Sequence, residues 1–349
     1  MAYTTIDKPT DYFNTKLYTG TGSTHNITGV GFQPDWVWIK SRSDAYAHYV
    51  FDVIRGATKQ VQTNLADPET TSANQLTSFD SDGFTLGTDI VTNGSSKTFA
   101  SWNWLAGGTA SSNTDGSITS SVSASTTSGF SIVSYTGNGS AGATVGHGLG
   151  SAPAVMIFKI RNTADNWRVY HQGIDATAPE DYHVQFNSTG ARIDNSGFFN
   201  DTAPTSSVFT LGSDSGINGS SNTFIAYCFA EKKGYSKFGS YQGNSSTDGT
   251  FVFLGFKPAF LIAKCSSATG SWFMADNKRD GFNVITKALL AESSAIEANE
   301  TYHAVDFLSN GFKWRGSDDR VNVSGKTYIY MAFAENPFVT STGIPTTAR

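Results

Sequence analysis

Short apolar runs, each entered through glycine and proline and ended by lysine, recur along the chain. The clearest examples are GFQPDWVWIK (31–40), GLGSAPAVMIFK (148–159) and GFKPAFLIAK (255–264). Runs of β-branched and aromatic residues bounded by Gly or Pro are typical of strands, and proline at a strand entry removes an N–H where its loss costs least. Each phrase therefore predicts a short, buried strand.

A second kind of segment alternates two apolar faces. It occurs as KTFASWNWLAG, NTFIAYCFAEK and KTYIYMAFAEN, whose first threonines are Thr98, Thr223 and Thr327. One face is strongly apolar (Trp102 and Trp104 in the first copy), and the other is mildly so. This pattern indicates a central strand that faces a sandwich core.

These phrases keep their order and nearly their spacing. In the three copies, the threonine of the second phrase follows the proline of the first phrase by 64, 70 and 69 residues. Similar landmarks at a fixed period predict internal repetition. We therefore divide the chain into an N-terminal arm, three repeats, a Ser/Thr/Gly-rich linker after the first repeat, and a C-terminal tail, at residues 1–10, 11–108, 109–128, 129–233, 234–339 and 340–349.

The predicted fold class is all-β, with three tandem β-sandwich repeats of jelly-roll or concanavalin-like type. One helix is predicted within residues 284–300. Trp36 and Trp38 could fill a core or form a sugar-stacking platform. Val155 and Ile157 occupy their places in the second repeat, which favours core burial because a core needs only bulk.

Composition and residue spacing exclude several kinds of partner. Charged residues make up only 15%, the net charge is −5, and there is no basic run, so nucleic acid is not expected as a partner. No apolar run approaches the length of a membrane span, so no membrane partner is expected either. Cys228 and Cys265 lack metal-ligand spacing, and the DSDG and NTDG phrases lack the rest of a calcium loop. We predict no cofactor and no metal site.

Catalytic signatures are also missing from the sequence. Glycan hydrolysis needs two carboxylates flanking the scissile bond, and the usual run of alternating carboxylates along a strand does not occur. No nucleophile elbow, zinc-protease motif, P-loop or dinucleotide fingerprint is present. We predict that the protein is not an enzyme.

One polar constellation repeats. Its first copy is Lys40, Asp52 and Arg55, and its second copy is Lys264, Asp276 and Arg279. The middle repeat breaks the pattern, with His171 and Ile174 at the Asp and Arg places. An Asp-x-x-Arg pair at a strand end can be a structural ion pair that pins a loop, or part of a ligand site. The structural role is favoured because an apolar position accompanies both copies.

Three loops mix aromatic with polar side chains, as recognition surfaces do. They lie at residues 43–52, 164–172 and 270–279, where a third strand is also expected. The candidate binding residues are Tyr46, His48, Asp165, Trp167, Arg168, Tyr170, His171, Trp272, Asn277 and Lys278.

Several longer phrases resemble one protein family. DYFNTKLYTGTGSTHNITGVGFQPDWVWIKSRS, TASSNTDGSITSSVSAST, FSIVSYTGNGSAGATVGHGLGSAP and TYIYMAFAENPF are similar to tailed-phage structural proteins of marine-phage type, which are identified as tail-fibre or virion proteins. The resemblance implies tandem concanavalin-like sandwiches displayed on a virion. It brings no catalytic motif that could be assigned to residues of this chain.

The resulting hypothesis is a phage virion surface protein of tail-fibre or receptor-binding type, located on the tail or capsid surface. Its expected partners are other virion proteins and a host-surface glycan or receptor, with a homo-oligomer, a trimer, as the expected assembly. A capsid decoration or head-fibre protein is the alternative, and a carbohydrate-active enzyme is the third hypothesis. The arm (1–10) or the tail (339–349) is expected to serve as an attachment strap.

Overall fold

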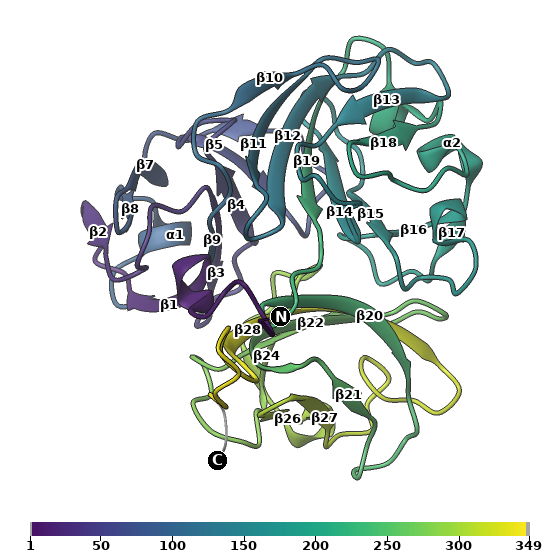
Figure 1. Cartoon of the computed structure of the whole chain (residues 1–349). Coiled ribbons are helices and arrows are strands. Elements are labelled where there is room, and N and C mark those ends of the chain that lie inside the picture. Colours follow the sequence, from purple (N-terminus) through teal and green to yellow (C-terminus); the bar gives the residue numbers. More distant parts are fainter. Residues whose placement is uncertain (1, 347–349) are drawn as a thin grey trace.

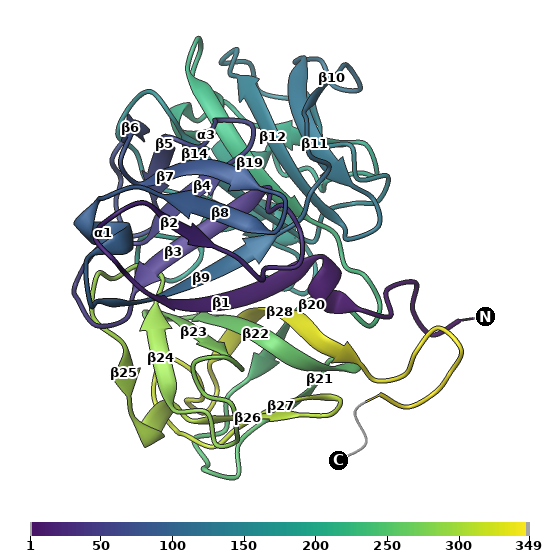
Figure 2. The same cartoon turned by 90° about the vertical axis from the view of Figure 1, so that its left-hand side faces the viewer.

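The computed structural model describes residues 2–346, and almost all of its regular structure is antiparallel strand. Three large sheets, each backed by a smaller one, form three β-sandwiches (Figure 1). Figure 2 shows the same body from the side of the first sandwich, with the first and last described segments of the chain beside the third. The all-β sandwich fold predicted from the sequence is confirmed.

The first sandwich contains a six-stranded and a three-stranded sheet. The large sheet has the order β1 (Phe13–Thr19), β9 (Thr98–Trp104), β3 (Trp36–Ser41), β4 (Tyr49–Asp52), β5 (Lys59–Gln62) and β6 (Thr70–Thr71). The small sheet has the order β2 (His25–Ile27), β8 (Gly83–Leu86) and β7 (Leu76–Asp80). A short helix, α1 (Ile90–Asn93), leads into β9 and is capped by the side chain of Asp89.

The second sandwich has eight strands in its large sheet. Their order is β10 (Ser111–Asn113), β11 (Ser120–Ser125), β12 (Phe130–Thr136), β19 (Thr223–Phe229), β14 (Val155–Ile160), β15 (Arg168–His171), β16 (Tyr182–Gln185) and β17 (Ile193–Asp194). The small sheet pairs β13 (Ala143–Gly146) with β18 (Val208–Leu211). Two short helices, α2 (Ser196–Phe199) and α3 (Ser215–Asn218), flank β18.

The third sandwich repeats the arrangement of the first. Its large sheet has the order β20 (Ser236–Gln242), β28 (Thr327–Pro337), β22 (Phe256–Cys265), β23 (Trp272–Asp276), β24 (Lys287–Leu290) and β25 (Ala298–Asn299). Its small sheet has the order β21 (Phe251–Phe253), β27 (Gly311–Trp314) and β26 (Val305–Leu308). Single 3₁₀ turns lie at Pro9–Asp11, Pro179–Asp181 and Thr301–His303. Six consecutive strands of the eight-stranded sheet, from β12 to β17, follow the same order as the six strands of the other two large sheets.

Each large sheet buries both of its faces. The outer face packs on the small sheet of its own sandwich, as Phe99 and Phe84 do in the first. The inner faces of all three large sheets meet in one central core, which contains Trp36, Trp38 and Trp102, each at most 2% exposed. Burying this much aromatic surface is the main force that holds the three sandwiches together. The predicted burial of Trp36 and Trp38 is confirmed.

The segment 109–128, expected as a linker, is part of the second sandwich. Strand β10 pairs with β11, and β11 pairs with β12 over residues 121–125. Val122 and Ile118 are buried in the outer core of this sandwich. The backbone of this Ser/Thr-rich segment is therefore held by the ladder, and the linker prediction is wrong.

The predicted helix at 284–300 is also wrong, because its alanine- and leucine-rich part forms β24 on the edge of β23. The N-terminal arm differs from a free strap as well. Ile6 is buried in the central core, and the Tyr3 hydroxyl donates a 2.6 Å hydrogen bond to the Gly255 carbonyl. Residue 1 of the arm and residues 347–349 of the tail lie outside the described residues, so the strap hypothesis is untested there.

Candidate functional site

Asp52 and Arg55 form a buried ion pair at the contact between the first two sandwiches. Both side chains are fully buried, and the Arg55 Nε donates to the Asp52 carboxylate. The backbone N–H of Arg55 donates to the same carboxylate at 2.9 Å, which caps the turn after β4. Tyr227, on β19 of the second sandwich, donates its hydroxyl to Asp52 Oδ2 at 2.7 Å. The pair therefore holds its own loop and also fixes the neighbouring sandwich.

Asp276 and Arg279 repeat this geometry at the contact between the third and first sandwiches. Arg279 Nε donates to Asp276 Oδ2 at 2.6 Å, and its backbone N–H donates to Oδ1 at 2.8 Å. The donor from the neighbouring sandwich is Trp102, on β9, whose Nε1 lies 3.1 Å from Asp276 Oδ2. Both carboxylates are saturated with donors from protein, which favours the structural role over a ligand site.

In the second sandwich His171 takes the place of the aspartate. Its Nδ1 accepts the backbone N–H of Gly173 at 3.0 Å, so Nε2 carries the proton and donates to the Tyr330 carbonyl of the third sandwich at 3.0 Å. Burial lowers the pKa of His171 to about 4. The imidazole is therefore neutral at ordinary pH and makes the third contact without an ion pair.

A second layer of contacts surrounds these pairs. Arg42 of the first sandwich binds Glu297 of the third through two hydrogen bonds of 2.9 and 2.8 Å. Arg161 of the second binds Glu69 of the first in the same two-pronged way, at 2.9 and 3.2 Å. In both cases the backbone N–H of the glutamate also donates to the carbonyl of the arginine. Planar guanidinium–carboxylate pairing of this kind fixes orientation as well as distance.

At the contact between the second and third sandwiches, the equivalent backbone hydrogen bond is present, but no arginine–glutamate ion pair accompanies it. Arg192 of the second sandwich stands at the glutamate position, and its backbone N–H donates to the Ser266 carbonyl of the third at 2.8 Å. Its guanidinium turns to Asp175 of its own sandwich, at 2.7 Å. The equivalent contacts thus run from first to second, second to third and third to first, and close a ring.

Three lysines at equivalent strand ends are buried within this ring. Lys159 donates to the Ala66 carbonyl of the first sandwich at 2.8 Å, and Lys264 donates to the Thr189 carbonyl of the second at 3.2 Å. Lys40 binds carbonyls in its own sandwich. Burial lowers the pKa of each of the three lysines to about 8.

Several predicted binding residues belong to the same contacts and are wrong as surface residues. Trp167 donates its Nε1 to the Gln62 carbonyl of the first sandwich at 2.8 Å, and Trp272 donates to the Gln185 carbonyl of the second at 3.0 Å. His48 stands at the equivalent position of the first sandwich and accepts the Trp38 Nε1 at 2.9 Å. All three are buried, as is His171. Trp167, Trp272 and His171 bind the neighbouring sandwich of the same chain, whereas the His48 side chain bonds to Trp38 of its own sandwich.

The other predicted binding residues are divided between interior and surface. Tyr170 is buried in the outer core of the second sandwich, and Arg168 is buried beside Asp165, with an Nη2–Oδ1 distance of 3.1 Å. Tyr46, Asp165 and Asn277 are half-buried, and Lys278 is exposed. Of the ten residues predicted, Asn277 lines the cavity described next.

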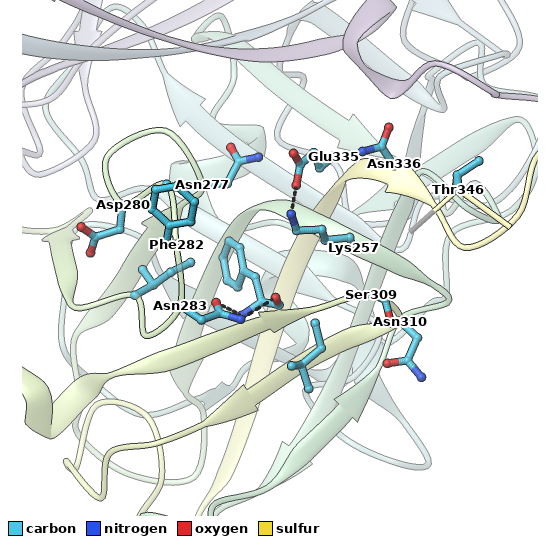
Figure 3. A pocket seen from close by; sticks show the side chains of 14 residues that line it. Lys257, Asn277, Asp280, Phe282, Asn283, Ser309, Asn310, Glu335, Asn336 and Thr346 are labelled. Carbon is cyan, nitrogen blue, oxygen red and sulfur yellow. Dashed lines mark hydrogen bonds and ion pairs between the residues drawn. The ribbon is translucent and has the colours of Figure 1, made fainter. Parts of the chain in front are cut away.

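A cavity of about 600 Å³ opens at one end of the third sandwich (Figure 3). Its walls come from the loop after β23, the β26–β27 turn, and the ends of β22 and β28. The lining residues are Lys257, Asn277, Asp280, Gly281, Phe282, Asn283, Ile285, Phe307, Leu308, Ser309, Asn310, Glu335, Asn336 and Thr346.

The cavity depends on features in which the third sandwich departs from the first. The loop between β23 and β24 has ten residues, whereas the loop between β4 and β5 has six. Strands β22 and β28 have ten and eleven residues, whereas β3 and β9 have six and seven. The longer strands carry Lys257 and Glu335, whose charged groups lie 2.7 Å apart on one wall.

The cavity wall is polar, and hydrogen bonds and an ion pair hold its loop in place. The Asn283 side chain donates to the Phe307 carbonyl at 2.9 Å and accepts the Phe307 N–H at 2.8 Å, which ties the loop to β26. Burial raises the pKa of Asp280, but the backbone N–H groups of Lys287 and Thr286 outweigh it, so the pKa lies below its usual range. Asp280 is therefore ionised and also pairs with Lys287 at 3.3 Å.

Within residues 2–346, no three His, Cys, Asp or Glu side chains gather closely enough to hold a metal ion. Nor does any helix in that range have the length and apolar character needed to span a bilayer.

The fold and the cavity define an all-β protein of three sandwiches packed around one core. Residues 8–337 match a family described as a domain of unknown function (DUF7483), and the chain belongs to that family. No curated protein and no solved structure matches it.

Proposed function

We propose that this chain is a non-catalytic bacteriophage virion surface protein of tail-fibre or receptor-binding type. It presents its sandwiches on the tail or capsid for attachment to a host-surface glycan or protein. The long phrases that resemble phage structural proteins support the virion location.

The observation that carries the proposal is the closed ring of equivalent contacts. The inner faces of all three sheets, the paired Asp and Arg side chains and the buried tryptophans are used to hold the sandwiches together. What remains for partners is the outer surface of a stiff body, and the third sandwich bears a polar cavity at one end. A rigid scaffold with a variable end suits attachment, because little ordering entropy is lost on binding.

The test uses a phage that encodes this chain. Mass spectrometry of purified particles is expected to find the chain, and gold-labelled antibodies against it are expected to decorate the tail. Added purified protein is expected to slow adsorption of the phage to its host by occupying the receptor. Absence of the chain from purified particles refutes the virion location.

Two further outcomes separate the alternatives. Label spread over the capsid, with no competition for adsorption, supports a decoration or head-fibre protein in place of a receptor-binding one. The homotrimer expected from the sequence stays a prediction, and light scattering on purified protein measures it directly. Because one chain already closes a ring of three, a monomer is compatible with the same attachment role.

A further inference from the structure

We infer that the cavity of the third sandwich is a binding site for a neutral saccharide, with Phe282 as its stacking platform. The inference rests on the proposed function in one respect, since it names the kind of host-surface ligand that the attachment protein would bind.

Phe282 is the first reason. The residue is 88% exposed, the highest value among the exposed large apolar residues of residues 2–346, and it lines the cavity. A bare aromatic face beside polar groups is the arrangement that stacks against the C–H face of a pyranose.

The polar groups opposite the ring are the second reason. Asn277 Oδ1 is buried and has no hydrogen-bond partner among the described residues, so a hydrogen-bond acceptor is left for a ligand. Asn310 and Asn336 also line the cavity, and no side-chain hydrogen bond within residues 2–346 ties either amide down. Figure 3 shows Asn277 between Phe282 and Glu335 in this view. Amides offer both a donor and an acceptor, which matches hydroxyl groups.

The charged residues of the cavity wall favour neutral over acidic saccharides. Lys257 is neutralised by Glu335, and Asp280 is ionised. Among the lining residues the carboxylates thus outnumber the cations, and no cation is left to pair with an acidic sugar. A uronic or sialic acid would find no unpaired cation among the lining residues, because Lys257 is held by Glu335 and Asp280 is paired with Lys287, so a neutral sugar is favoured.

The rigidity of the site is the third reason. The loop that carries Phe282 is fixed on both sides, by the two Asn283 bonds to Phe307 and by the backbone bonds from Thr286 and Lys287 to Asp280. A preformed wall loses little freedom on binding, which matters for saccharide ligands with small contact areas.

The experiment uses the purified full chain with chitobiose, maltotriose and lactose as neutral probes, and 3′-sialyllactose as the acidic counterpart of lactose. Binding is measured by calorimetry and by ligand-observed NMR, at probe concentrations up to about 10 mM. At least one neutral probe is expected to bind. Phe282→Ala is expected to weaken that binding at least about tenfold, because it removes the stacking face from a site that is otherwise unchanged.

Phe251→Ala is the matched control, since Phe251 is an exposed phenylalanine on β21 of the same sandwich that does not line the cavity, and it is expected to change binding less than about twofold. Asn277→Ala is expected to weaken binding without loss of thermal stability, because its Oδ1 has no partner to lose. Circular dichroism of all variants verifies the fold.

The inference is overturned if none of the neutral probes binds, if Phe282→Ala binds as well as the parent, or if 3′-sialyllactose binds more tightly than lactose. These outcomes leave the proposed function open, because particle composition and adsorption competition test it without any saccharide. Conversely, saccharide binding by a chain that is absent from virions would refute the proposed function and keep the site.

Discussion

Removal of the Asp52 carboxylate is the sharpest test of how the sandwiches are held together. Asp52→Ala deprives the fully buried Arg55 guanidinium of its main counter-ion and leaves the Tyr227 hydroxyl without an acceptor. Glu69, 3.6 Å from Arg55 Nη1, compensates only partly. Breaking one partner of a buried pair costs about 3–5 kcal/mol, so we expect a loss of that size in the free energy of unfolding. That is a large part of the roughly 5–15 kcal/mol available to a folded protein.

The assay is equilibrium unfolding in urea, followed by far-UV circular dichroism and tryptophan fluorescence. Lys8→Ala is the matched control, because Lys8 pairs with Asp11 on the surface, where a pair contributes about 0–1 kcal/mol. Tyr227→Phe removes the two hydrogen bonds of this hydroxyl across the contact, the one it donates to Asp52 and the one it accepts from Arg55 Nη2 at 3.3 Å. We expect it to cost about 1.5–3 kcal/mol.

The double variant, Asp52→Ala with Tyr227→Phe, tests whether the two residues act through the contact between the sandwiches. If Asp52 and Tyr227 stabilise the body through the same bond, the combined loss is smaller than the sum of the single losses. Additive losses, or a loss from Asp52→Ala no larger than that from Lys8→Ala, would show that the buried pair does not join the sandwiches.

Three other predictions follow from the shared core and its buried ionisable groups. Residues 234–346 expressed alone are expected to be insoluble or molten in circular dichroism, because their inner face loses its cover; a cooperatively folded fragment would contradict this. The folded pKa of His171, about 4, lies below its ordinary 6.5, so its contribution to stability is complete above pH 6.5. That contribution falls by up to about 3 kcal/mol toward pH 4. In urea unfolding, His171→Gln should lose less stability than the parent as the pH is lowered. Lys159 changes stability in the same direction, because its folded pKa of about 8 lies below its ordinary value and the unfolded chain therefore keeps a proton that the folded chain has lost. Stability is expected to rise from pH 8 toward 10. NMR titration of Lys159 measures the pKa, and Lys159→Met is expected to show a flatter rise.

The strands were predictable because their signals are local. Short apolar runs bounded by Gly and Pro correctly placed β3, β14 and β22, and the two-faced alternation correctly placed β9, β19 and β28. The linker prediction failed because the Ser/Thr-rich β11 is held by ladder bonds to β12, which leave no mark on composition. The helix prediction at 284–300 failed because the pairing of β24 with β23 overrides the propensity of Ala and Leu.

The candidate site was harder to predict for a physical reason. Trp167 and Trp272 have the chemistry of a recognition surface, and they do recognise a partner, but that partner is another sandwich of the same chain. Sequence alone does not separate an internal interface from an external one, because both pair aromatic rings with polar groups. The exposure of Phe282 depends on a loop length and a strand extension whose meaning appears only once the sheets are assembled.

The closed ring within one chain has an evolutionary consequence. In a homotrimer every substitution appears three times, so a change that improves one face alters the other two as well. Here each junction is encoded separately, and one of them uses a neutral histidine and a backbone bond where the other two use ion pairs. The end of the third sandwich can therefore adapt to a new ligand while the two other sandwiches keep the body intact.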